Sequence, residues 1–150
     1  MELQRDSREF IGLLNSANVR YVIVGGYAVA FHGHPRFTGD MDVFVDPSLP
    51  NARLLEGVLR RFGFGDVGLS AEDFTRADTI VQLGLPPNRI DLLTALTGVT
   101  FPEAWDQRVE GELGGLRVSF ISKDLLIRNK RATGRTQDLA DAEAIEGQAG

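Results

Sequence analysis

The sequence predicts a single α/β (α+β) domain with a mixed, mostly antiparallel sheet of about five strands and helices packed mainly on one side. Three observations lead to this class. Short apolar runs bounded by glycine or proline, such as residues 21–24, have the length of buried strands. Residues 6–18 and 51–62 place apolar side chains three or four positions apart, as an amphipathic helix does. Two pairs of runs are joined by short turns, which is consistent with antiparallel hairpins.

The expected elements follow from these patterns in chain order. Asp6 or Ser7 can cap the first helix, and Gly63 is suited to end the helix over 51–62. Ser122 can cap a helix over 123–133 that Gly134 ends, and a last helix starts at Thr136. A short helix follows the first strand as far as residue 31, and residues 146–150 form a frayed tail. Strands are expected at 21–24, 40–45, 79–85, 89–93, 108–112 and 116–121.

Composition limits the class of protein. The length of 150 residues suits one domain, which buries roughly two-thirds of its unfolded surface. Without cysteine there is no disulfide framework and no thiolate metal site. The N-terminus has no signal-peptide pattern, and no apolar run approaches the roughly 20 residues that span a bilayer. We therefore expect a cytoplasmic protein without membrane contact. The net charge of −5 argues against broad electrostatic binding of nucleic acid.

The stretch 21–46 contains the candidate site. Gly25 and Gly26 end a strand and begin a helix, so the backbone there can approach phosphates. Asp40 and Asp42 are two positions apart on the next strand, and their side chains therefore point the same way. Such a pair repels unless a cation lies between, and Mg²⁺ binds carboxylates together with substrate phosphates. These residues indicate a metal–nucleotide site, and the alternatives are a tight turn at the two glycines and a solvated edge, or a turn cap, at the two carboxylates.

A third carboxylate stands in the strand 89–93. Asp91 lies there between two large apolar residues, and a lone charge in a core strand is costly unless it is paired or bound to a metal. A salt bridge to an arginine such as Arg36 is one interpretation. Metal binding together with Asp40 and Asp42 is the other, and it is favoured because those two carboxylates already need a cation.

Several polar residues near these carboxylates are further candidates. Arg36 could clamp a phosphate and Thr38 could donate a hydrogen bond to one. His32 and His34 have no partner at zinc-ligand spacing, and a structural role suits them equally well. A basic cluster follows near the C-terminus: Lys123, Arg128, Lys130, Arg131 and Arg135. It is either a solvated helix face or a functional surface, with Lys130 reaching toward a triphosphate.

Taken together, these motifs resemble those of the DNA-polymerase-β-like nucleotidyltransferase superfamily. That superfamily has Gly-Gly or Gly-Ser, then Asp-x-Asp or Asp-x-Glu, then a third carboxylate on another strand. The variant GGYAVAFHGHPRFTGDMDV is most similar to the AbiEii-like branch, which includes nucleotidyltransferase toxins of type IV toxin–antitoxin systems. Residues 129–135, with Asp138 and Asp141, also resemble that branch. The similarity extends over residues 20–145.

The resemblance implies one minimal nucleotidyltransferase domain over residues 1–150, with Mg²⁺ as cofactor (two ions, Mn²⁺ being an alternative). Such an enzyme moves a nucleoside monophosphate from an NTP such as ATP to a hydroxyl and releases pyrophosphate. The implied site residues are the catalytic, metal-binding carboxylates Asp40, Asp42 and Asp91, and the nucleotide contacts Gly25, Gly26, Arg36, Thr38 and Lys130.

The resemblance also implies what accepts the nucleotide. RNA or a partner protein is expected, as in the toxin-like relatives, and a partner subunit or antitoxin could supply surface that so short a chain lacks. One alternative is an enzyme that modifies a hydroxyl of a small molecule such as an antibiotic. The other is a catalytically degenerate binding module or antitoxin component, against which the three intact carboxylates argue.

Overall fold

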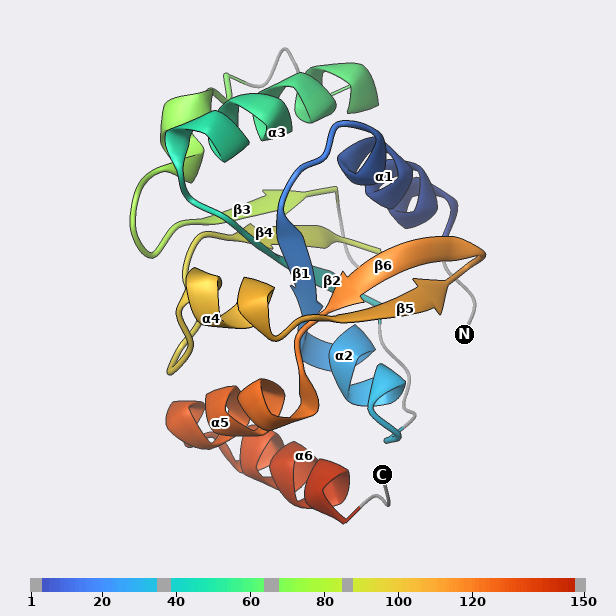
Figure 1. The fold of residues 1–150 in the computed structure, drawn as a ribbon, viewed down its shortest axis with the longest axis vertical. Coiled ribbons are helices and arrows are strands. Elements are labelled where there is room, and N and C mark those ends of the chain that lie inside the picture. The colour runs from blue at the N-terminus through green and yellow to red at the C-terminus, as the bar shows by residue number, and fades with distance from the viewer. Residues whose placement is uncertain (1–3, 35–38, 64–67, 85–87, 148–150) are drawn as a thin grey trace.

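The computed structural model describes residues 4–34, 39–63, 68–84 and 88–147. Within these ranges the strands are β1 (Tyr21–Val24), β2 (Met41–Val45), β3 (Ile80–Leu83), β4 (Ile90–Leu93), β5 (Val109–Leu113) and β6 (Leu116–Phe120). They form one sheet in the order β3-β4-β2-β1-β6-β5 (Figure 1). The sheet lies in the middle of the molecule.

The strand pairing confirms a mixed, mostly antiparallel sheet. Neighbours β1 and β2, β3 and β4, and β5 and β6 are antiparallel, whereas β2 with β4 and β1 with β6 are parallel. The described residues form six strands rather than about five. Each of the six expected strand segments forms a strand, and β6 pairs with β1 and thereby brings the β5–β6 hairpin into the same sheet.

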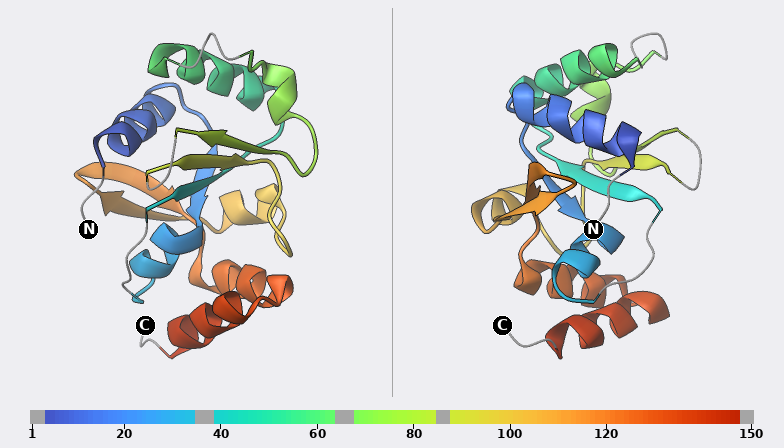
Figure 2. Two further views of the ribbon diagram at one scale, coloured as in Figure 1. Left: turned by 180° about the vertical axis from the view of Figure 1, so that it is seen from behind. Right: turned by 90° about the vertical axis from the view of Figure 1, so that its right-hand side faces the viewer.

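The helices are α1 (Arg5–Ser16), α2 (Gly25–Phe31), α3 (Leu49–Phe62), α4 (Phe101–Asp106), α5 (Lys123–Thr133) and α6 (Thr136–Glu146), with one 3₁₀ turn at Ala71–Phe74. In Figures 1 and 2, α1 and α3 lie at one end of the long axis, α5 and α6 lie at the other, and the sheet lies between them. This differs from the expectation of helices mainly on one side. The difference arises because α5 and α6 pack chiefly against each other and close the opposite end.

Local sequence signals set most helix ends, but neither Asp6 nor Ser7 caps the first helix, because both lie inside α1, whose N-cap position is Gln4 without a side-chain cap. The hydroxyl of Ser122 accepts a hydrogen bond from the backbone N–H of Leu125 at 3.3 Å and so caps α5. Gly134, at φ 70°, ends α5 in the left-handed conformation that glycine adopts easily. Ser70 and Asp73 form a capping box on the 3₁₀ turn. Consequently α5 begins and ends at defined residues, which matters because this helix forms part of the site.

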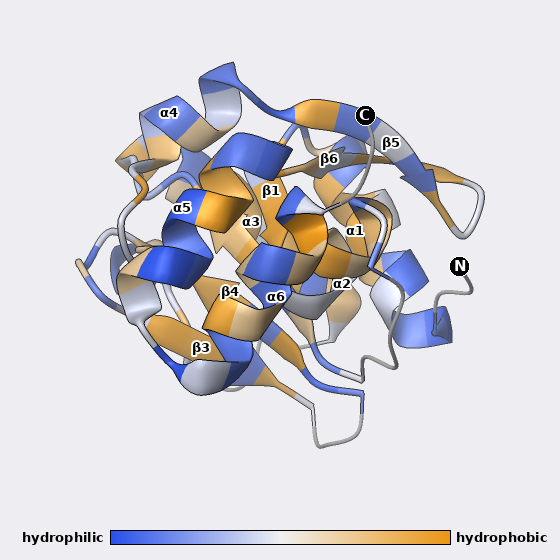
Figure 3. Cartoon of the chain, turned by 90° about the horizontal axis from the view of Figure 1, so that it is seen from below, coloured by the Kyte–Doolittle hydropathy of each residue, from blue (hydrophilic) through white to orange (hydrophobic). Residues whose placement is uncertain are grey.

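The core follows the apolar pattern of the sequence. Val22, Ile23 and Val43 in the central strands are fully buried. In Figure 3 the central strands are coloured as hydrophobic, whereas α5 and α6 carry both hydrophilic and hydrophobic residues. Burial of these side chains is the main favourable contribution to folding. None of the helices in the described ranges has the length and apolar character needed to cross a bilayer.

An aromatic stack anchors α2 to the hairpin of β5 and β6. The rings of Phe31 and Phe120 are nearly parallel, with their centroids 4.0 Å apart. Gly111 on β5 leaves room for this stack, since a Cβ there would lie 2.5 Å from Cε1 of Phe31. A side chain at position 111 must therefore displace the stack and, with it, the end of α2.

We expect Gly111→Ala to destabilise the protein by about 1–3 kcal/mol, as overpacking of a core does. Urea unfolding monitored by circular dichroism measures this change. Gly57→Ala is the matched control, because a Cβ at that position inside α3 meets nothing within 4 Å. In that helix interior alanine should stabilise by about 0.5–1 kcal/mol. Equal effects of the two substitutions would contradict the proposed packing role of Gly111.

Candidate active site

The three carboxylates singled out in the sequence come together where the inner strands β2 and β4 begin. Asp42 on β2 and Asp91 on β4 are directly paired in register on neighbouring parallel strands. Asp40 directly precedes β2. The strand begins at Met41, one residue later than expected. The antiparallel pairing of β1 with β2 places Val24 opposite Asp42 and so brings the turn at Gly25 to the same place.

Arg89 holds two of these carboxylates. Its Nε and Nη2 donate to the two oxygens of Asp91 at 2.7 and 3.2 Å, and Nη2 also lies 3.2 Å from Oδ2 of Asp40. The salt bridge of Asp91 is thus formed with Arg89, whereas the sequence-based interpretation named Arg36. The signal for Arg89 was its position two residues before Asp91, because such side chains share a face of a strand.

The remaining carboxylate, Asp42, carries an unfavourable charge. Burial raises its pKa to about 6, and the negative charges of Asp91 and Asp40 act in the same direction, while Lys130 and Arg89 oppose the rise. Additional positive charge beside this carboxylate would therefore be favourable. Carboxylate oxygens are the ligands that Mg²⁺ prefers, so the donor set fits a divalent metal. Among the described residues, however, no group of three or more His, Cys, Asp or Glu side chains is already arranged around one point.

Gly25 brings the main chain against Asp42. It has φ +66° at the start of α2, and a Cβ there would lie 2.1 Å from Oδ2 of Asp42. Any other residue would collide with the carboxylate, so glycine is required both by conformation and by space. Gly26 follows in the first turn of α2. The Gly-Gly motif therefore allows the backbone to run directly beside the carboxylates.

A cavity of about 600 Å³ opens beside Asp42. Its apolar lining comes from the β3–β4 side and the segment after β4, including Ile80, Leu93 and Leu96. Its charged lining includes Lys130, Arg135 and Asp138 from α5, α6 and the turn between them. This volume lies within the range of sites for small molecules and cofactors, about 300–1,000 Å³.

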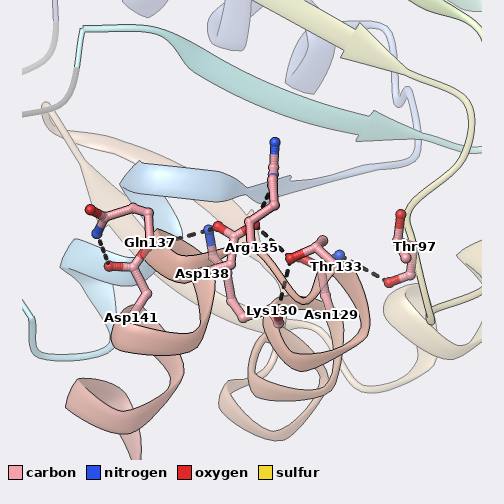
Figure 4. A network of polar contacts seen from close by, with 8 residues as sticks. All are labelled: Thr97, Asn129, Lys130, Thr133, Arg135, Gln137, Asp138 and Asp141. Atoms are coloured by element: carbon pink, nitrogen blue, oxygen red, sulfur yellow. Dashed lines mark hydrogen bonds and ion pairs between the residues drawn. The ribbon is translucent and has the colours of Figure 1, made fainter.

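Lys130 is built into the wall of this cavity rather than extending freely into it (Figure 4). Its ammonium lies 3.0 Å from Oδ1 of Asp138 and 3.5 Å from Oδ2 of Asp141, and all three residues are buried. Oδ2 of Asp138 also accepts hydrogen bonds from the hydroxyl of Thr133 at 2.6 Å and from Nε of Arg135 at 2.7 Å. Asp138 therefore holds three cavity-lining side chains in place.

The outer members of the basic cluster are also paired. Arg128 bonds Glu103 at 2.6 Å, and Arg131 forms an ion pair with Glu146. Both pairs are at least partly exposed, and such pairs stabilise a protein by little. The predicted basic cluster is consequently neutralised in large part by acidic neighbours, and it offers less positive charge to a nucleic acid than the sequence indicated.

Other candidates from the sequence have different outcomes. Arg36 and Thr38 lie outside the described residues. The ring Nε2 of His32 is within hydrogen-bond distance, 2.7 Å, of the carbonyl oxygen of Ile121. This contact links the end of α2 to the residue after β6 and gives His32 a structural role.

Comparison with known proteins identifies the family. The model of the family described as "Nucleotidyl transferase of unknown function (DUF2204)" matches residues 3–147. The chain belongs to this family. Family membership and fold make the protein a nucleotidyltransferase, and they confirm the superfamily that the motifs resembled. A comparison with curated protein sequences gives no match.

Solved structures share the fold at low identity. A candidate nucleotidyltransferase from Thermotoga maritima has a TM-score of 0.59 at 14% identity, covering 97% of this chain and 94% of that one. The lincosamide antibiotic adenylyltransferase LnuA, bound to lincomycin, has a TM-score of 0.59 at 13% identity, with 97% and 98% covered. An antigenic nucleotidyltransferase-like protein from Paracoccidioides brasiliensis has a TM-score of 0.54 at 20% identity, with 93% and 74% covered.

The network around Asp138 predicts a pH dependence of stability. Burial alone would raise the pKa of Asp138, but hydrogen bonds from Thr133, Lys130 and Arg135 outweigh it and lower the pKa to about 2. Because the folded-state pKa lies below the ordinary value of 3.8, the stabilisation is complete above pH 4 and is lost as the pH falls toward 2.

Asp138→Asn should therefore lower the free energy of unfolding at pH 7 by at least about 2 kcal/mol, and the difference from wild type should shrink toward pH 2. Urea unfolding at pH 7, 5 and 3 measures this. Glu143→Gln, an exposed substitution on the same helix, is the control and should change little at any pH. A difference that does not depend on pH would contradict the assigned role of the Asp138 carboxylate.

Proposed function

We propose that this protein transfers a nucleoside monophosphate from an NTP to a hydroxyl acceptor in a reaction that depends on Mg²⁺ and releases pyrophosphate. The observation that carries the proposal is the pairing of Asp42 and Asp91 on parallel strands, with Asp40 beside them and a cavity next to them. Three carboxylates of this kind, in a chain of a nucleotidyltransferase family, suit phosphoryl-type transfer, which needs mainly positioning and charge neutralisation.

Two of the carboxylates would serve the nucleotide donor and the third would serve the acceptor hydroxyl. Asp40 and Asp42, nearest the glycine turn, would hold the metal that accompanies the triphosphate, and Asp91 would complete the acceptor side. When bound, two Mg²⁺ ions, or Mn²⁺ in their place, neutralise charge on the attacking and leaving oxygens. The acceptor oxygen bonds to the α-phosphorus as the bond to pyrophosphate breaks, and Asp91 takes the proton of the hydroxyl.

Other residues would bind the donor. The backbone at Gly25 and Gly26 can approach phosphates because no side chain intervenes. Lys130 places a fixed positive charge near Asp42, as its effect on the pKa of that carboxyl indicates. Arg36 and Thr38 keep their proposed place in the donor site on the strength of the resemblance alone.

Two classes of acceptor are supported by different observations. RNA or a partner protein is supported by the Lys130, Asp138 and Asp141 pattern, which resembles the AbiEii-like toxins and is assembled into one buried network. A small hydroxylated molecule is supported by the size of the cavity and by the ion pairs that Arg128 and Arg131 form with acidic side chains. One protein of the same fold is an antibiotic adenylyltransferase with lincomycin bound.

Addition of Mg²⁺ with an NTP should raise the melting temperature, because the metal relieves the repulsion around Asp42. At about a hundred times the dissociation constant, the ligand should add about 2.7 kcal/mol to stability. Differential scanning fluorimetry with each of the four NTPs, with and without Mg²⁺, measures the shift and identifies the preferred base. A melting temperature that no combination changes would argue strongly against a metal–nucleotide site.

Transfer should depend on Asp91 more than donor binding does. We expect Asp91→Asn to bind Mg·NTP within a few-fold of wild type but to transfer roughly 10²–10⁴-fold more slowly, whereas Asp42→Asn should impair both. Titration calorimetry measures binding, and single-turnover assays measure transfer from labelled NTPs to total RNA, lysate protein and a panel of hydroxylated small molecules.

Glu110→Gln is the control for this pair of variants, because Glu110 also pairs with an arginine two positions earlier, Arg108, but at the far edge of the sheet. It should bind and transfer like wild type. A folded Asp91→Asn variant that transfers at the wild-type rate would make Asp91 only a partner of Arg89, and the three-carboxylate mechanism would be wrong.

A further inference from the structure

Arg89 occupies the place where a cation is needed at the three carboxylates. It directly precedes β4, and its side chain is 24% exposed. The guanidinium bonds both oxygens of Asp91, at 2.7 and 3.2 Å, and one oxygen of Asp40 at 3.2 Å. The backbone N–H of Arg89 lies 3.3 Å from the other oxygen of Asp40. A two-pronged contact of this kind is among the stronger ion pairs in proteins.

This contact uses the same atoms that a metal would use. Both carboxylate oxygens of Asp91 already accept hydrogen bonds from Arg89, and a divalent ion binds through those oxygens. The guanidinium keeps its charge at any physiological pH, so it cannot be removed by deprotonation. Each oxygen keeps a second lone pair, but a metal that takes the bidentate position of the carboxylate competes there directly with the guanidinium.

We propose that Arg89 is an internal counter-ion that competes with the divalent metal for Asp91 and Asp40. This inference rests on the proposed function, since it concerns the metal of that reaction. While Arg89 holds Asp91 and Asp40, the metal-free fold is stabilised and these two carboxylates are occupied. The apparent association constant for the metal is then the intrinsic constant multiplied by the fraction of molecules in which the guanidinium has left the carboxylates.

A competing cation and a positioning residue predict opposite changes in metal affinity when Arg89 is replaced. If Arg89 only oriented Asp91 for the metal, as a positioning residue does, its removal would weaken metal binding. If Arg89 competes with the metal, its removal strengthens binding and at the same time destabilises the metal-free protein, because the carboxylates then repel one another without compensation.

The test compares Arg89→Gln with wild type in the absence of nucleotide, using Mn²⁺ as the probe. Electron paramagnetic resonance of free Mn²⁺ gives the affinity, and thermal unfolding gives the stability. We expect Arg89→Gln to bind Mn²⁺ on the order of tenfold more tightly, as loss of hydrogen bonds to charged groups implies. The variant should melt at a lower temperature without metal and should gain more from Mg²⁺ than wild type does.

Arg108→Gln is the matched control. Arg108 forms an ion pair with Glu110 through Nε at 3.2 Å, again two positions apart and with a similarly exposed side chain, but it directly precedes β5, the edge strand farthest from β4 along the sheet. Its replacement should leave Mn²⁺ affinity unchanged.

A second readout needs no variant. In wild-type protein, the Nε–Hε resonance of Arg89 reports the ion pair by NMR, and saturation with Mg²⁺ should shift it and speed its exchange with water. This measurement also covers the case in which Arg89→Gln does not fold.

Each outcome decides the matter. Tighter metal binding by Arg89→Gln, or an Arg89 resonance released by Mg²⁺, supports the competition. Equal or weaker binding by a folded variant, or a resonance unchanged at saturation, overturns it while leaving the proposed function intact if wild type binds Mg·NTP. If neither protein binds metal with or without NTP, both the competition and the metal-dependent function fail.

Discussion

Repulsion among carboxylates is the constraint on which the site depends. Asp42 and Asp91 lie at the same end of two adjacent parallel strands, and Asp40 stands beside them. Partly buried like charges are unfavourable unless cations compensate them. Arg89 supplies one such cation from the strand itself, and Lys130 supplies another from a distant helix. Burial, together with the charges of Asp91 and Asp40, still raises the pKa of Asp42, so a further cation beside this carboxylate would be favourable.

Acidic and basic side chains alternate with increasing distance from the three carboxylates. Lys130 lies near the carboxylates and is itself held by Asp138 and Asp141, while Asp138 also binds Arg135. A buried cation is favourable only when acidic partners and hydrogen bonds surround it. This network ties α5 to α6, and Asn129 of α5 donates a hydrogen bond to the carbonyl oxygen of Thr97 in the segment after β4. This arrangement fixes the charged wall of the cavity while leaving its interior accessible.

Steric requirements act together with the electrostatic ones. Gly25 is the residue at which the chain passes closest to Asp42, and a side chain there would meet the carboxylate at 2.1 Å. The main chain at Gly25 therefore runs against the carboxylate of Asp42, and in the proposed function it would lie within reach of the metal and the donor phosphates. A cavity with charged groups on one wall and apolar side chains on the other suits a ligand that combines a polyphosphate with a less polar part.

The sequence by itself determined the strands, most helix ends and the identity of the three carboxylates, because these depend on alternation, caps and spacing within short segments. Only the tertiary structure decided which charges meet. Arg89 pairs with Asp91, and Lys130 is enclosed by Asp138 and Asp141 instead of standing free. The paired surface arginines and the sixth strand in the sheet were likewise decided by contacts between distant segments. Spacing in a sequence fixes the direction of a side chain on its own element, but the partner of a charge depends on how elements pack.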